Sequence, residues 1–173
     1  MNASQIHLAL NHVPLFFSIA GGLVLLYGFI RKQEQIKFLS LYFMIIAALF
    51  TIPVYLTGEG TEESVEKLPG ISENLIEAHE EMAKIGLIVI IITGIAALIT
   101  LLVKKRISLL KPSLVFCAFL TFISFGVMAQ TAHLGGKIRH TEIRNGAVIS
   151  TENEAGENAG VEQDKEKEDK DDD

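Results

Sequence analysis

The chain has 173 residues, of which 49% are hydrophobic, with a formal net charge of −6. Residues 150–173 hold eleven acids and three lysines, a net charge of −8, so the rest of the chain carries +2. A single cysteine, Cys117, excludes an intrachain disulfide and the paired-cysteine attachment of c-type haem.

Four apolar stretches, 13–30, 38–56, 82–103 and 113–134, are each long enough to cross a bilayer as a helix. No strong charge lies in the middle of any stretch, and none shows the polar stripe of a helix in a soluble bundle. The residues before the first stretch lack the basic start of a signal peptide, so we expect an uncleaved helix. The sequence predicts an all-α integral membrane four-helix bundle in the lipid bilayer.

The loops that join the spans predict the orientation. The first and third loops are basic, with Arg31, Lys32 and Lys37 in one and Lys104, Lys105, Arg106 and Lys111 in the other. The loop between the second and third spans contains eight glutamates and one lysine. Basic loops stay in the cytoplasm. We therefore expect a multi-pass protein of a bacterial inner membrane, with both termini and the acidic loop on the periplasmic side.

The acidic loop is predicted to contain helical structure. Residues 61–66 are typical of a short helix with acids at its N-terminus, where the helix dipole favours them. Pro69-Gly70 indicates a turn, and Ser72 is a candidate N-cap. A helix that begins after Ser72 is expected to continue into the third span.

The fourth span is predicted to end at Gly135-Gly136, and residues 137–144 to follow as a short polar segment. From residue 146 the chain has too little apolar content to fold. We therefore expect a transmembrane domain over residues 1–145 and a disordered acidic tail over residues 146–173.

All five histidines lie near the predicted periplasmic ends of the spans. They are His7 and His12 at the start of the first helix, His79 at the start of the third, and His133 and His140 around the end of the fourth. A single histidine at a membrane surface is an ordinary interfacial residue, but three helices that bring histidines to one end favour a ligand site. His7 and His12 are five residues apart, about 140° around a helix, so we expect them to face different surroundings.

A thiol-free set of histidines suits haem iron with two imidazole ligands, or a copper or zinc ion. The acids lack the Glu-x-x-His spacing of a di-iron carboxylate site. No phosphate loop, HExxH or GxSxG motif occurs in the sequence. We therefore expect a cofactor-binding protein without catalytic activity of its own, and no nucleic-acid partner.

Several motifs resemble the DUF2231 family of bacterial four-helix membrane proteins. The opening His7-Leu-Ala-Leu-Asn-His12-Val-Pro14 is similar to the family's His-x4-His-x-Pro, although Leu8 stands where many members have proline. His79 matches a histidine at the start of the family's third helix, and Leu134-Gly135-Gly136 with His140 resembles its closing motif. The segments 53–59 and 136–143 look like the version found in Bacteroidetes-type bacteria. The resemblance covers residues 5–145 and implies ligand roles for His7, His12, His79 and His140, with His133 outside the pattern.

The leading hypothesis is a b-type haem or redox-metal protein that transfers electrons between the membrane and a periplasmic or membrane redox partner. His79 would be one axial ligand, and His7, His12 or His140 the other. The alternative is a non-catalytic accessory subunit of a larger membrane complex, whose end rich in histidine and glutamate is a docking surface.

Overall fold

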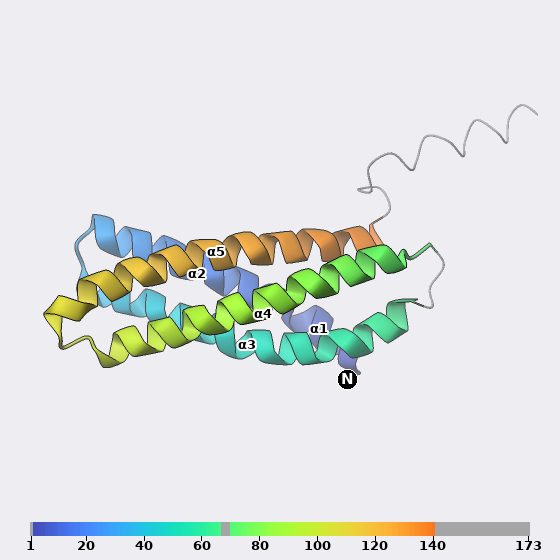
Figure 1. Cartoon of the computed structure of the whole chain (residues 1–173), viewed down its shortest axis with the longest axis horizontal. Coiled ribbons are helices and arrows are strands. Elements are labelled where there is room, and N and C mark those ends of the chain that lie inside the picture. Colours follow the sequence, from blue (N-terminus) through green and yellow to red (C-terminus); the bar gives the residue numbers. More distant parts are fainter. Residues whose placement is uncertain (1, 67–69, 141–173) are drawn as a thin grey trace, which may run out of the picture. The chain divides into compact units, whose positions relative to one another are not determined.

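The computed structural model describes residues 2–66 and 70–140 and contains five helices there (Figure 1). They are α1 (Ala3–Leu10), α2 (His12–Ile30), α3 (Glu34–Glu66), α4 (Glu73–Leu102) and α5 (Ile107–Arg139). No strand occurs in this part of the chain, and four helical segments are long and apolar enough to cross a membrane. The prediction of an all-α protein with four helices able to cross a membrane is thus confirmed for the described residues.

The chain divides into two units, one up to Ile138 and one from Arg139 onwards. The first unit contains nearly all of the helical structure, and the rest of this section concerns that unit. The tail predicted for residues 146–173 lies outside the described residues.

Each spanning helix shows apolar side chains on its surface and places hydroxyl groups inside. Leu23, Leu49, Ile88 and Phe122, one from each span, are between 59% and 78% exposed. The buried polar side chains of the described residues are all serines and threonines. This distribution is the reverse of a soluble bundle, and it suits a protein whose surface faces lipid.

Small residues allow the helices to approach closely. In α2, a Cβ at Gly21 would lie 3.4 Å from Met44 Cγ of α3, and one at Gly22 would lie 3.4 Å from Thr121 Cγ2 of α5. Where α4 crosses α3, a Cβ at Gly94 would overlap the Ala48 side chain. Contacts of this kind drive association in lipid, where the solvent is as apolar as the side chains.

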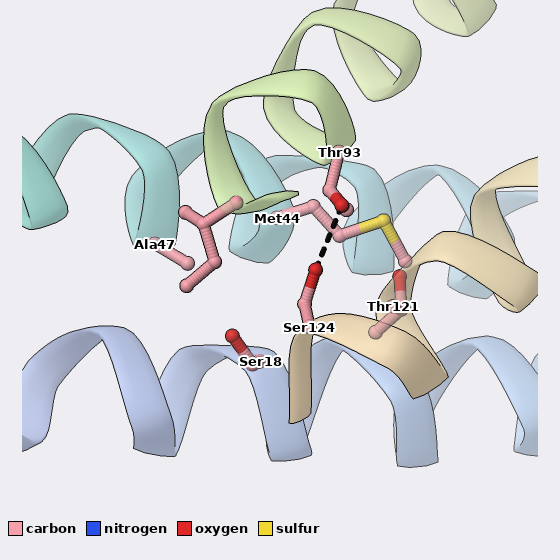
Figure 2. A pocket seen from close by; sticks show the side chains of 7 residues that line it. Ser18, Met44, Ala47, Thr93, Thr121 and Ser124 are labelled. Carbon is pink, nitrogen blue, oxygen red and sulfur yellow. Dashed lines mark hydrogen bonds between the residues drawn. The ribbon is translucent and has the colours of Figure 1, made fainter. Parts of the chain in front are cut away.

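A cluster of hydroxyl groups lies at the centre of the bundle, and we call Ser18, Thr93, Thr121 and Ser124 the hydroxyl core (Figure 2). Ser18, Thr93 and Thr121 donate to the carbonyls four residues earlier in their own helices, at 2.7–2.8 Å. Thr93 and Ser124 also share a 2.8 Å hydrogen bond between α4 and α5. The space among these residues is too small to hold a water molecule.

Three boundaries differ from the sequence prediction, and a fourth agrees with it. A break at Asn11 separates α1 from α2, and residues 61–66 form the last turns of α3 instead of a separate helix. The prediction that the fourth span ends at Gly135-Gly136 is wrong, because α5 continues to Arg139. As predicted, Ser72 is the N-cap residue of a helix that continues into the third span, although its side chain makes no capping hydrogen bond.

Candidate functional site

We call the part of the bundle that contains α1, the C-terminal turns of α3, the start of α4 and the end of α5 the histidine end. Neighbouring helices run antiparallel, so the start of α4 lies at the same end as the end of α5 (Figure 1). His133 lies near the end of α5, and His12 follows α1 at the start of α2. This arrangement brings residues that are far apart in the sequence into one region of the first unit.

Helix α1 positions His7. A capping box begins the helix, in which the Asn2 side chain accepts from Gln5 N and the Gln5 side chain accepts from Asn2 N. Small residues hold α1 against α3, since a Cβ at Gly60 would lie only 2.9 Å from Ala3 Cβ. Close to this contact, Ser4 Oγ lies 3.4 Å from Ser64 Oγ.

The half-buried His7 side chain is bonded to the backbone of α3, with Nδ1 at 2.9 Å from Val54 O. Because a carbonyl oxygen only accepts hydrogen bonds, Nδ1 carries the proton and donates it. In the neutral imidazole, Nε2 is then the nitrogen with the available lone pair.

The half-buried His79 side chain is held in the same way by the other pair of helices. Its Nδ1 lies 3.0 Å from Thr131 O of α5, so Nδ1–H is again the donor and Nε2 keeps its lone pair. In the part of the chain that the structure describes, neither His7 Nε2 nor His79 Nε2 makes a hydrogen bond.

Both imidazoles lie at the histidine end, within range for the charge of one to affect the other. His7 belongs to α1 and His79 to α4, and the two residues are 72 positions apart in the sequence. We call His7 and His79 the imidazole pair. When the rings are neutral, each holds its proton on Nδ1 and has an Nε2 lone pair of the kind that binds a metal ion or haem iron.

The other three predicted site residues have different surroundings. His12 is exposed and stacks on Phe16, with ring centroids 6.3 Å apart. His133 is exposed on α5, and His140 is exposed and belongs to the second unit. The expectation that His7 and His12 face different surroundings is confirmed, because His7 contacts α3 while His12 points to the surface.

Sequence reasoning missed the groups that hold the imidazole pair. The acceptors are the backbone carbonyls of Val54 and Thr131, and a backbone atom leaves no signature in residue type. A glycine occurs four residues after each acceptor, Gly58 and Gly135, and it lies against the corresponding imidazole. These glycines were the available signal, but Gly135 was interpreted as a helix breaker.

Acidic side chains of α3 and α4 gather at the histidine end. Glu59, Glu62, Glu66 and Glu80 are close enough to interact electrostatically, and Glu80 forms a 2.8 Å ion pair with Lys84. Among residues 2–66 and 70–140, no three His, Cys, Asp or Glu side chains are placed to hold a metal ion together. The candidate site is therefore a two-nitrogen site.

Comparisons with family models, with curated proteins and with solved structures gave no match to this chain. The resemblance to the DUF2231 family therefore continues to depend on the sequence motifs alone.

Proposed function

We propose that this chain is a membrane-embedded electron-transfer protein that binds haem b, or another redox metal, through Nε2 of His7 and of His79. One observation carries the proposal: both imidazoles donate Nδ1–H to a backbone carbonyl of a neighbouring helix and keep Nε2 available at the same end of the bundle.

The hydrogen bonds to the carbonyls support this chemistry. Histidines that bind metals commonly donate their second N–H to a carbonyl or carboxylate, which fixes the tautomer and raises the basicity of the ligating nitrogen. Both members of the imidazole pair have such a partner, whereas the exposed His12 and His133 have none among the described residues.

The number of nitrogen donors favours haem over zinc or copper. Catalytic zinc sites have three protein ligands and structural sites four, whereas haem iron needs only two axial ligands because the porphyrin supplies the other four. Bound haem would supply one-electron chemistry, and His7 and His79 would hold and orient its iron.

The loop charges support a periplasmic position for the histidine end, in a bacterial inner membrane. In that orientation the imidazole pair would exchange electrons between the membrane and a redox partner on the periplasmic side. The hydroxyl core, which has no room for water, supports electron transfer without a water-filled path through the bundle.

The test is an absorption spectrum and a metal analysis of the protein purified from membranes without added metal, followed by titration with haemin. A low-spin haem spectrum and one iron per chain are the expected result. A protein that lacks iron, copper and zinc and does not bind haemin, Cu²⁺ or Zn²⁺ would refute the proposal.

The acidic surface formed by Glu59, Glu62, Glu66 and Glu80 favours a second candidate, an accessory subunit that docks a basic partner at this end. In that case Glu62→Gln together with Glu66→Gln would abolish capture of the partner and leave any bound metal unchanged. If the double variant instead retains its partner, the docking role is excluded.

A further inference from the structure

The two halves of the imidazole pair are built in the same way. His7 belongs to the hairpin formed by α1, α2 and α3, and His79 to the hairpin formed by α4 and α5. In each hairpin, a histidine near the start donates Nδ1–H to a carbonyl near the outgoing end, Val54 O or Thr131 O. The same device therefore occurs twice in one chain.

A glycine completes each half. Gly58 follows Val54 by four residues, and Gly135 follows Thr131 by four residues. Four residues are about one turn of an α-helix, so each glycine lies one turn beyond the acceptor carbonyl. The side of the helix that offers the carbonyl thus has no side chain at the next turn, and the imidazole occupies that space.

The two glycines differ in how closely the ring approaches. A Cβ at Gly135 would lie 3.0 Å from Cε1 and 3.2 Å from Nδ1 of His79. A Cβ at Gly58 would lie 3.6 Å from Cε1 and 3.8 Å from Nδ1 of His7, which is ordinary contact. The space beside His7 would accommodate a methyl group, whereas the space beside His79 would do so only if the ring moved by a few tenths of an ångström.

We infer that Gly135 is a positioning residue, which keeps the His79 ring in reach of Thr131 O and so sets the direction of Nε2, the atom that would hold the metal. Gly58 lies in ordinary contact with His7, so its role is weaker. This inference accounts for the glycine at position 135, since a side chain there would displace the ring. It rests on the proposed function only for the identity of the bound group.

The first test compares Gly135→Ala, Gly58→Ala and Gly126→Ala in the full-length protein. Gly126 is the matched control, because it lies in the same helix and a Cβ there would meet nothing within 4 Å. ¹⁵N NMR of the histidine rings without metal reports which nitrogen carries the proton, and haemin titration reports ligation.

We expect Gly135→Ala to shift the His79 ¹⁵N signals and to weaken haemin binding by about 10- to 100-fold, the range seen when the group that orients a ligating histidine is lost. Gly58→Ala should have a smaller effect, and Gly126→Ala none. If Gly135→Ala gives the same His79 signals as Gly126→Ala, the inference is wrong, whatever haemin does. If neither the parent protein nor any variant binds haemin, but Gly135→Ala still shifts the His79 ¹⁵N signals, only the proposed function is wrong.

The second test covers the case in which Gly135→Ala folds poorly. Because the unfavourable contact is with the His79 ring, removing that ring should remove the cost, and the double variant Gly135→Ala with His79→Ala should melt at the temperature of His79→Ala alone. If the double variant melts at a lower temperature than His79→Ala alone, the unfavourable contact of the new methyl group is not with the His79 ring. That result would overturn the inference.

Discussion

The hydroxyl core and the imidazole pair are two groups of polar side chains in the bundle, and they use their polar atoms differently. Ser18, Thr93 and Thr121 each donate to a carbonyl of their own helix, and Ser124 and Thr93 share a hydrogen bond between α4 and α5. In the imidazole pair, each ring uses one nitrogen and keeps the other available.

This difference distinguishes a structural role from a binding role. A buried polar group whose hydrogen bonds are complete has little to offer a ligand, and it contributes to packing and helix association. A half-buried imidazole that is bonded at Nδ1 and unbonded at Nε2 still has a lone pair for a further partner, as the proposed function requires. Changes in the two regions should therefore have different consequences.

The largest effect is expected from the imidazole pair. Replacing His7 or His79 with Ala removes one of two nitrogen donors, so we expect loss of the low-spin haem spectrum and at least about a 10-fold weaker affinity for haemin. His12→Ala and His133→Ala are the matched controls, because both histidines are exposed at the same end. Equal losses in all four variants, measured by haemin titration, would contradict the assignment of the pair.

An intermediate effect is expected where α4 crosses α3. Gly94→Ala places a methyl group on the Ala48 side chain and forces the helices apart, which should cost about 1–3 kcal/mol in the free energy of unfolding. Gly126→Ala should cost nothing, because its new methyl group has space. Thermal or denaturant unfolding in detergent measures both. We expect the haemin spectrum of folded Gly94→Ala to remain that of the parent, and a changed spectrum would mean that the two regions are not independent.

The smallest effect is expected in the hydroxyl core. Thr93→Val and Ser124→Ala each remove the hydrogen bond between α4 and α5, and a bond of this kind in a membrane protein contributes about 0.6 kcal/mol. A double-mutant cycle of unfolding free energies isolates this contribution. A coupling of several kcal/mol, or any loss of haemin binding, would assign the hydroxyl core more than a packing role.

Much of the fold could be predicted because a helix that crosses a bilayer needs a fixed minimum length and apolar side chains. Span length and the absence of charge specify four helices, and Ser72 before a run of helix-forming residues specifies where α4 begins. The path of α5 through Gly135-Gly136 could not be predicted, because glycine disfavours a helix by only about 1 kcal/mol and tertiary packing outweighs that cost.

The sequence predicts His79 as one ligand and leaves the second open among His7, His12 and His140. Selecting His7 depends on two features, the packing of α1 on α3 and the backbone carbonyl of Val54. Neither feature has a signature in residue type. The five-residue spacing of His7 and His12 did indicate that these neighbours would separate, because it places them on different sides of a helix.

The repetition of one histidine device in each hairpin has a consequence for the order of assembly. Each imidazole finds its carbonyl inside its own hairpin, so each half of the site is complete as soon as that hairpin has entered the membrane. The two available nitrogens become neighbours only when the hairpins associate, in a second step driven by helix packing. On the proposed function, binding of a metal would therefore report that the two hairpins have associated.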